Sequence, residues 1–416
     1  MLLCQKDYKH KKNGFPMQKI IMPNGLTVIY EKRDSPAVVV EIMIKTGSNH
    51  ESEQERGISH FLEHLLFEGT KKRPSNWAIS REIEKVGGEF NAYTTNERTC
   101  FYVRVLKKHI DMAIEILADI MQNSLLRRED IEREKKVVLK EIDLVLDEPR
   151  FYQWILLQKS LFKKHPCRYP TYGDKKHIKN LNEEKIRRFL EKYYFPGNMV
   201  LSIVGNVPQW KKKIESSLCL PFKKSKVSLI QQEPYAKNIS TTTEKKAGAN
   251  TYLLLGFIGV SRDHLEAYPL EIVNTILGRG QSGRLFTEIR SKQGLAYDVG
   301  TQHIAEVSFG YFALYATVDK KKSALVKRLL LQELEKIKNT TSLELEEAKE
   351  ALEGEFLLAL EDPQRLADQL LFWEQALGAE EVHHFVRKIK KVTLNEVIRV
   401  TEKYLKNYTE VVLEGN

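Results

Sequence analysis

Apolar side chains recur at strand-like spacing in several short runs of the N-terminal half. Residues 26–46 contain two such runs around a turn, and residues 99–106, TCFYVRVL, form another. A further strand is expected at residues 197–207, where an apolar run is bounded by glycine, and a short extended run at residues 89–95, EFNAYTT. Runs of this length and composition, bounded by Gly and polar residues, are typical of β-strands.

Other stretches follow the spacing of an amphipathic helix, with apolar residues three or four positions apart. The first is HFLEHLLFEGT, residues 60–70, and a second helix is expected near residues 75–86. Helical spacing returns at residues 107–122 and 128–146, after the strand-like runs. The N-terminal half is therefore expected to combine strands with helices packed on one face of their sheet.

The C-terminal half repeats this order. Residues 251–259 and 310–318 resemble strands, and residues 265–278 resemble a helix that ends at glycine. Residues 286–300 echo residues 80–95, because in both a Glu-Ile pair leads through Lys to Gly and an extended run with Ala and Tyr. Helical spacing is expected from about residue 321 to the end.

We therefore predict an α+β fold of two homologous domains, each a mainly antiparallel β-sheet with helices packed on one face. The boundary is expected in a polar, proline-containing stretch of weak periodicity. The expected segments are an N-terminal extension at 1–16, a first domain at 17–215, a linker at 216–240 and a second domain at 241–416.

Composition narrows the class of protein. The chain has 416 residues, of which 42% are hydrophobic and 29% charged, as in globular proteins. No apolar run approaches the ~20 residues that cross a bilayer, and the N-terminus does not resemble a secretory signal or a transit peptide, so a cytoplasmic location without membrane contact is expected. The four cysteines are widely scattered, which argues against a disulfide framework or a zinc ribbon.

The net charge of +10 raises nucleic-acid binding as an alternative. Its basic clusters are short, acidic residues lie among the rest, and no nucleic-acid motif accompanies them. We therefore expect no nucleic-acid partner.

The stretch HFLEHLLFEGT allows two interpretations. It could be a buried helix with a few polar residues at its rim, since a histidine on an apolar face is usually part of the core. Alternatively, His60 and His64 are one helical turn apart, so that both imidazoles could bind one zinc ion. Glu63 would lie beside them, placed to take a proton from a zinc-activated water. The order HxxEH is the inverse of the commoner HExxH zinc motif.

A zinc site of this kind needs a third protein ligand. Glu134 and Glu141 are seven positions apart, and therefore share a face of the helix expected at 128–146. Either carboxylate could bind the ion while the other orients the site. Both could also belong simply to the solvated face of a charged helix.

Six blocks of the sequence, in order, resemble one family: the pitrilysin, insulin-degrading enzyme and mitochondrial processing peptidase family of inverted-motif zinc metallopeptidases. The resemblance spans residues ~17 to ~410 and matches the short two-domain members. The blocks are PNGLTVIYE (23–31), GISHFLEHLLFEGT (57–70), GGEFNAYTT (87–95), EREKKVVLKEI (132–142), GNMVLSIVGN (197–206) and SGRLFTEIRSKQGLAYDVG (282–300).

The resemblance implies a role for each matching residue. His60, His64 and Glu141 would bind one zinc ion per chain, Glu63 would be the general base, and Glu134 would support catalysis. Two further groups of matching residues are a substrate-binding strand at Glu89, Phe90, Asn91 and Ala92, and a catalytic pair, Arg290 and Tyr297, that holds the substrate and stabilises its carbonyl oxygen. Without the resemblance, Asn91 could shape a turn, Arg290 could be a surface arginine and Tyr297 a core aromatic.

The implied function is a zinc-dependent endopeptidase that cleaves peptides or unfolded segments. Short members of the family pair two chains, so a homodimer is expected, in which Arg290 and Tyr297 complete the partner's site. The alternative is a non-catalytic or processing-type subunit in a heterodimer with a homologous chain.

Overall fold

The computed structural model describes residues 17–223, 230–235 and 237–415, so the expected N-terminal extension lies outside the described residues. The chain forms two compact units, and each unit takes segments from both halves of the sequence. The first unit comprises Met1–Ile142, Pro170–Ser228 and Ala359–His383, and the second comprises Asp143–Tyr169, Leu229–Leu358 and His384–Asn416. The linear domain division remains a prediction.

The first unit contains a six-stranded sheet in the order β1-β2-β6-β3-β5-β4. Its strands are β1 (Met17–Ile21), β2 (Thr27–Glu31), β3 (Ala37–Ile44), β4 (Glu89–Thr94), β5 (Thr99–Leu106) and β6 (Met199–Val204). All neighbouring strands are antiparallel except β2 and β6. The position of β4 at one edge of this sheet matters for the site described below.

Helices of the N-terminal half cover one face of this sheet, where Phe67 packs against Phe90 of β4 and Phe101 of β5. The helices of this part of the chain are α1 (Ile58–Leu66), α2 (Asn76–Glu84), α3 (Ile110–Asn123), α4 (Arg128–Asp147), α6 (Lys175–Lys179), α7 (Glu183–Tyr193) and α8 (Trp210–Ser217).

The second unit repeats the strand arrangement of the first, and its described residues contain no counterpart of β1. Its order is β7-β11-β8-β10-β9, and β7 and β11 form its parallel pair, as β2 and β6 do in the first sheet. The strands are β7 (Ser240–Lys245), β8 (Thr251–Ile258), β9 (Asp298–Ala305), β10 (Gly310–Val318) and β11 (Thr409–Glu414). The expected α+β class, with two sheet-and-helix domains, is confirmed.

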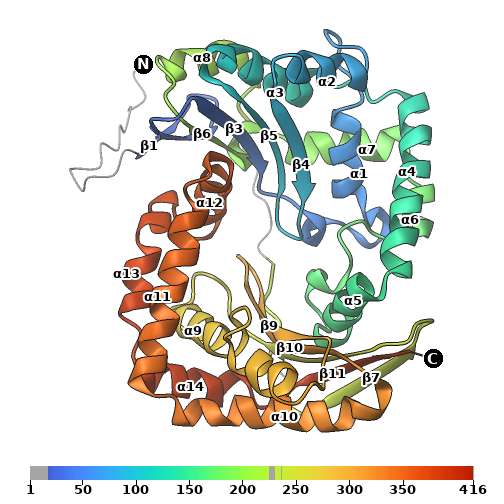
Figure 1. Cartoon of the computed structure of the whole chain (residues 1–416). Helices are drawn as coiled ribbons and strands as arrows, with labels where there is room; N and C mark the ends of the chain where they lie inside the picture. The colour runs from blue at the N-terminus through green and yellow to red at the C-terminus, as the bar shows by residue number, and fades with distance from the viewer. Residues whose placement is uncertain (1–16, 224–229, 236, 416) are drawn as a thin grey trace. The chain divides into compact units, whose positions relative to one another are not determined.

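Each half of the sequence contributes one helix to the unit that is formed mainly by the other half. Helix α5 (Pro149–Leu161) follows the N-terminal half but packs on β8 and β11, where Leu157 lies in an apolar cluster with Leu254 and Val411. Helix α12 (Pro363–Ala376) comes from the C-terminal half but packs on β3 and β6 of the first sheet. Figure 1 shows α5, in green, beside the second sheet and α12, in orange to red, beside the first.

The remaining helices belong to the C-terminal half, and 3₁₀ or π turns connect several elements. The helices are α9 (Ala267–Gly278), α10 (Ser323–Glu335), α11 (Ser342–Ala359), α13 (Phe385–Lys390) and α14 (Leu394–Tyr404). The turns are η1 (Ser48–His50), η2 (Glu53–Glu55), η3 (Lys107–His109), η4 (Pro166–Arg168), η5 (Pro196–Asn198), η6 (Phe286–Ser291), η7 (Lys320–Lys322), η8 (Lys336–Asn339) and η9 (Ala379–His383).

The expectation that helical spacing continues to the end of the chain is wrong. The chain leaves α14 at Tyr404 and ends in β11, a buried strand between β7 and β8. Its six residues are too few to show a clear period directly after a helix. Strand β7, STTTEK, likewise carried no apolar signal because it is a polar edge strand.

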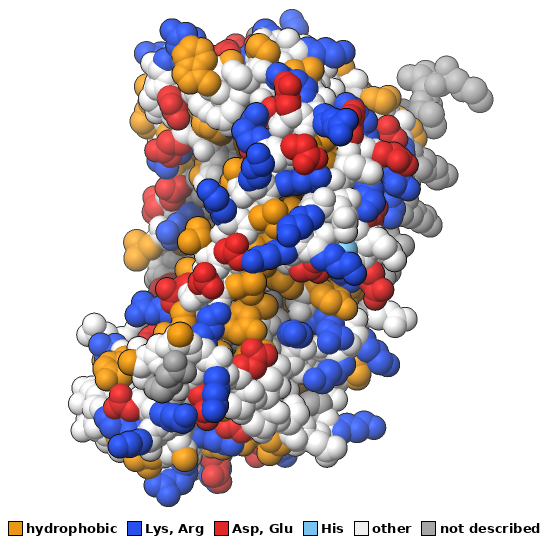
Figure 2. Space-filling view, turned by 90° about the vertical axis from the view of Figure 1, so that its right-hand side faces the viewer, with side chains coloured by type: hydrophobic (Ala, Val, Ile, Leu, Met, Phe, Trp, Pro, Cys, Tyr) orange, Lys and Arg blue, Asp and Glu red, His pale blue; other side chains and the backbone are white. Residues whose placement is uncertain are grey.

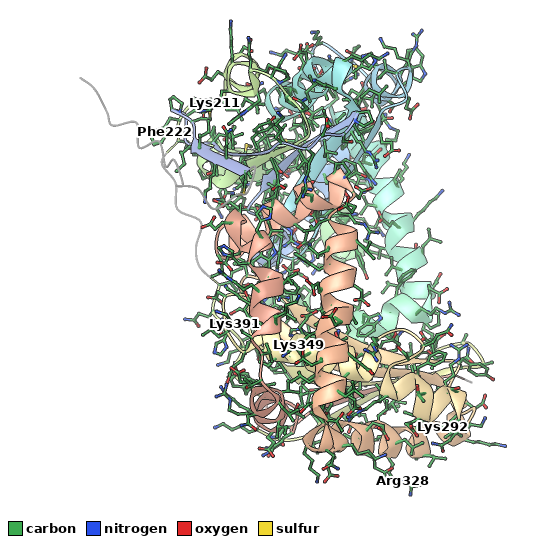
Figure 3. All side chains as sticks on the ribbon, turned by 60° about the vertical axis from the view of Figure 1, so that its left-hand side comes forward. Lys211, Phe222, Lys292, Arg328, Lys349 and Lys391 are labelled. Atoms are coloured by element: carbon green, nitrogen blue, oxygen red, sulfur yellow. The ribbon has the colours of Figure 1, made fainter. Side chains whose placement is uncertain are left out.

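Charged side chains of both signs are mixed over the surface. On the face drawn in Figure 2, Asp and Glu side chains lie among the Lys and Arg side chains. Lys292 and Lys349, labelled in Figure 3, pair with Glu288 at 2.7 Å and Glu346 at 2.9 Å. None of the helices in the described part of the chain is long and apolar enough to span a membrane.

Candidate metal centre

Helix α1 presents three polar side chains on an otherwise apolar helix. Ile58, Phe61, Leu62, Leu65 and Leu66 are buried in the first unit. The side chains of His60, Glu63 and His64 remain partly exposed, because positions i, i+3 and i+4 share one face of a helix. The stretch HFLEHLLFEGT therefore forms a helix whose apolar face packs into the first unit. The His and Glu residues of the HxxEH motif lie on its other, partly exposed face.

The start of α1 is fixed by a glycine and by a buried carboxylate. Gly57 precedes the helix with φ of +91°, and a Cβ there would lie 2.5 Å from the carbonyl oxygen of Tyr172. The Glu51 carboxylate accepts hydrogen bonds from the N–H of Gly57 at 2.8 Å and of Ser59 at 2.9 Å. It thereby satisfies two N–H groups that a helix start leaves without partners.

Burial raises the pKa of Glu51 to about 7, although the two N–H groups and Arg56 lower it. The folded state therefore binds this proton more tightly than the unfolded state, and the stability linked to Glu51 is lost as the pH rises from about 4.5 to 7. Compared with Glu51→Gln, the free energy of unfolding of the wild-type chain is expected to fall by about 2.5 kcal/mol between pH 5 and pH 8. Urea unfolding of the zinc-free proteins at both pH values measures this difference. A difference that stays constant with pH would contradict the expectation.

The structure brings His60, His64 and Glu141 together. One nitrogen or oxygen atom from each lies within 4.8 Å of those of the other two. The distances from the Nε2 atoms of His60 and His64 to the Glu141 carboxylate are both 3.7 Å, and the two imidazole centroids are 4.7 Å apart. Two ligands of a tetrahedral zinc, each about 2.1 Å from the ion, are about 3.4 Å apart. The three side chains therefore fit a zinc ion with little movement.

Glu134 lies at the other ring nitrogen of His64 from Glu141. Its carboxylate is 3.3 Å from Nδ1 of His64, the ring nitrogen that does not face Glu141. A carboxylate in this place holds the imidazole in the tautomer whose Nε2 lone pair can bind a metal. Of the two alternatives open from the sequence, the geometry favours Glu141 as ligand and Glu134 as the residue that orients His64.

The pKa values of the histidines differ with their surroundings. Burial, with the neighbouring His64, lowers the pKa of His60 to about 3, so its imidazole is neutral at neutral pH, as a metal ligand must be. Burial also acts against the charged form of His64, but the hydrogen bond to Glu134 and the nearby carboxylates raise its pKa. Burial therefore favours the neutral form of His60, whereas the surrounding carboxylates favour the charged form of His64.

Glu63 lies on the same face of α1, and its position depends on a residue that the sequence did not single out. The Thr94 hydroxyl, at the end of β4, donates a 2.6 Å hydrogen bond to Oε2 of Glu63. Burial raises the pKa of Glu63, while this hydrogen bond lowers it. Thr94 lies two residues beyond Ala92, within the strand expected to bind substrate, which was the only signal for it in the sequence.

The residues expected to bind substrate form most of strand β4. Glu89 and Asn91 are exposed, Ala92 is partly exposed, and Phe90 packs on Phe67 with ring centroids 5.2 Å apart. The Asn91 side-chain oxygen accepts a 2.9 Å hydrogen bond from the N–H of Ala92. Within the described residues, β4 pairs only with β5, so its outer edge can accept an extended peptide as a further strand.

Arg290 and Tyr297 belong to the second unit. Arg290 lies on the π-helical turn η6, is exposed, and has its guanidinium 4.9 Å from the centre of the Phe286 ring. Tyr297 directly precedes β9, is 59% exposed, and donates a 3.3 Å hydrogen bond to Asp319. Both are at the surface of their unit, and their part in the site remains a prediction.

The sequence matches two family models in series. The model for insulinase, peptidase family M16, matches residues 27–175, and the one described as the peptidase M16 inactive domain matches residues 180–352. An uncharacterized zinc protease of Rickettsia felis is 34% identical over 412 residues, which cover 97% of this chain and 98% of that protein. The chain belongs to peptidase family M16. The first match includes the candidate metal-binding residues and strand β4, and the second includes Arg290 and Tyr297.

Another relative of this M16 chain and two solved structures also match it over most of their length. The uncharacterized zinc protease YmxG of Bacillus subtilis is 31% identical over 342 residues, covering 81% of this M16 chain and 83% of the relative. The crystal structure of a protease from Helicobacter pylori has a TM-score of 0.91 at 22% identity and covers 96% of this chain and all of that one. The crystal structure of a peptidase M16 inactive domain from Pseudomonas fluorescens has a TM-score of 0.87 at 22% identity. The match covers 96% of this chain and 98% of that one. These structures share the fold.

Proposed function

We propose that the chain is a zinc-dependent endopeptidase that hydrolyses peptides or unfolded segments. The observation that carries the proposal is the cluster of His60, His64 and Glu141, with Glu63 on the same helix face and hydrogen-bonded to Thr94 of edge strand β4. Membership of peptidase family M16 and relatives named zinc proteases support it. The candidate metal ligands, the candidate base and a sheet edge that could bind a peptide therefore all lie in the first unit.

His60, His64 and Glu141 would hold one zinc ion per chain, and Glu134 would keep His64 in its binding tautomer. When bound, zinc supplies a Lewis acid that lowers the pKa of a coordinated water and polarises a carbonyl group. Glu63 takes the proton from the attacking water and delivers it to the leaving amine. Its Oε2 is held by Thr94, so Oε1 remains available for proton transfer.

The substrate would add an extended strand to the outer edge of β4. Main-chain hydrogen bonds carry such pairing, so many sequences can bind, provided that the segment is unfolded. Asn91 and Ala92 would lie nearest the scissile bond. This mode of binding explains why the proposed substrates are peptides or unfolded segments.

The experiment is cleavage of a mixed library of unfolded peptides by the purified chain, with zinc measured in the same samples. We expect one zinc per chain, cleavage at internal peptide bonds, loss of cleavage on treatment with a chelator, and recovery when zinc is restored. Zinc binding without cleavage would favour the alternative, a subunit that requires a homologous partner chain. Absence of zinc binding would overturn the proposal.

Thr94→Val is expected to lower kcat by about tenfold or more, because it removes a hydrogen bond to a charged group while preserving side-chain shape. Thr94 acts as a positioning residue, so KM and zinc content should change little. Thr94→Ser keeps the hydroxyl and should retain most of the activity, which separates loss of the hydrogen bond from loss of packing. Equal loss in both variants would indicate a packing role only.

We further propose that the active form is a homodimer in which Arg290 and Tyr297 act on the partner's metal centre. Both side chains could then hold the substrate and donate to the carbonyl oxygen as charge develops. Mixing inactive Glu63→Gln chains with impaired Tyr297→Phe chains should restore about a quarter of wild-type activity, since half of the dimers are mixed and each mixed dimer has one intact site. Mixed dimers without restored activity would contradict this arrangement.

A further inference from the structure

A second cluster of metal-binding side chains lies in the first unit and shares no residue with the centre on α1. Glu41 lies on β3, Cys100 on β5 and Asp368 on α12. In the strand register Met43 faces Cys100, so Cys100 and Glu41 point to the same side of the sheet, two residues apart along β3. One ligand atom from each of Glu41, Cys100 and Asp368 lies within 4.8 Å of those of the other two.

The cluster contains a buried carboxylate that lacks a complete set of partners. Glu41 and Cys100 are both 0% exposed, and Oε2 of Glu41 has no hydrogen-bond partner among the described residues. The other oxygen of Glu41 is 3.5 Å from the hydroxyl of Tyr93, which donates its closer hydrogen bond to Asp368. A buried polar atom without a hydrogen-bond partner is destabilising, so this oxygen is expected either to carry a proton or to bind a cation.

We propose that Glu41, Cys100 and Asp368 form a second cation site, for a divalent ion of the zinc class, which fastens helix α12 to strands β3 and β5. A thiolate with two carboxylates is a donor set that zinc accepts, with a Zn–S distance of about 2.3 Å and Zn–O distances of about 2.0–2.2 Å. Ligand atoms of such a site are about 3.5 Å apart, so side-chain adjustments of about 1 Å complete it. The Tyr93 oxygen or a water can occupy the fourth position.

The charged groups in and around the cluster favour binding of a divalent cation. Burial and the Asp368 charge raise the pKa of Glu41, and burial with both carboxylates raises the pKa of Cys100, while the positive charge of Arg98 lowers both. An ion with two positive charges, together with Arg98, would balance the thiolate and the two carboxylates.

The ion would link segments that are far apart in the sequence. Strands β3 and β5 come from the N-terminal half and α12 from the C-terminal half, so the site would cross-link the exchanged helix to its sheet. Asp368 and Tyr93 are partly exposed, whereas Glu41 and Cys100 are buried. A bound ion should therefore raise the thermal stability of the first unit.

Cadmium is the probe, because a thiolate bound to Cd²⁺ gives an ultraviolet charge-transfer band and the centre on α1 contains no thiol. The full chain is first loaded with a single equivalent of zinc, to fill the centre on α1 and leave the second site free, and is then titrated with Cd²⁺. We expect one additional Cd²⁺ per chain with a thiolate band, and a rise in unfolding temperature. Cys100→Ser should abolish the band, whereas Cys167→Ser and Cys219→Ser should retain it.

Variants that keep the thiol test the carboxylates and guard against misfolding of Cys100→Ser. Glu41→Gln and Asp368→Asn should each weaken Cd²⁺ binding by at least about tenfold and leave peptide cleavage unchanged. A band that persists in Cys100→Ser, no band in the wild type, or Cd²⁺ affinity unchanged in both carboxylate variants would overturn the proposal. These readouts are independent of peptidase activity.

Discussion

Glu63→Gln is expected to lower kcat/KM for peptide cleavage by about 10²–10⁴-fold while zinc content stays at one per chain. The amide has nearly the shape of the carboxylate, and its oxygen can still accept the Thr94 hydroxyl that now binds Oε2. It cannot take a proton at neutral pH. The three proposed zinc ligands remain in place, so the loss reports proton transfer rather than metal binding. Single-turnover cleavage and metal analysis of the same preparation measure both quantities.

The matched control is Glu84→Gln, an exposed glutamate on α2 that should leave both cleavage and zinc content unchanged. If Glu63→Gln retained more than about a tenth of the wild-type rate, Glu63 would not be the general base. If it lost zinc as well as activity, the effect would lie in the metal centre, and the assignment of Glu63 as a proton carrier would lose its support.

The parts of this site that lie within one helix could be predicted from the sequence. His60, Glu63 and His64 share a face because helix geometry fixes positions three and four apart, and Glu134 and Glu141 share a face for the same reason. The resemblance implied Glu141 as the ligand, but the spacing alone left open which glutamate approaches the histidines. That answer required the packing of α4 against α1, which places Glu134 at Nδ1 of His64 and Glu141 at the Nε2 atoms.

Other contacts between distant segments could not be predicted from the spacing of apolar and polar residues. Thr94 meets Glu63 only because β4 pairs at the sheet edge beside α1. Helical spacing identifies an apolar face but not the sheet that covers it, so the exchange of α5 and α12 between the units left no sequence signal. The cluster of Glu41, Cys100 and Asp368 depends on that exchange, because one of its members arrives on α12.

The two rigid helices that carry the proposed ligands give the centre a defined geometry. Helix α1 is fixed at its start by Glu51 and packed along its length, and α4 buries Ile131, Val138 and Ile142 between its exposed positions. Sites on packed helices hold their side chains more accurately than sites on loops. Substitutions of single ligands on these helices should therefore change metal affinity without changing the fold around the site.

Glu141→Gln is expected to lower zinc affinity by more than about 100-fold, because it removes the one negatively charged ligand of the proposed set. The Glu141 carboxylate is 3.7 Å from both Nε2 atoms, and a neutral amide oxygen there is a much weaker ligand for zinc. The side chain is 42% exposed, so the substitution should not disturb packing. Competition with a chelator of known zinc affinity measures the change, and peptide cleavage should fall in parallel at limiting zinc.

Glu134→Gln is the matched comparison on the same helix, two turns earlier. The glutamine oxygen can still accept a hydrogen bond from Nδ1 of His64, so only the charge that strengthens this bond is lost, and zinc affinity should fall about tenfold. The larger loss should therefore belong to Glu141→Gln. The reverse order would exchange the two roles, with Glu134 as the ligand, and equal small losses would mean that neither glutamate binds the ion. The pair thus decides the question that the spacing of the two glutamates left open.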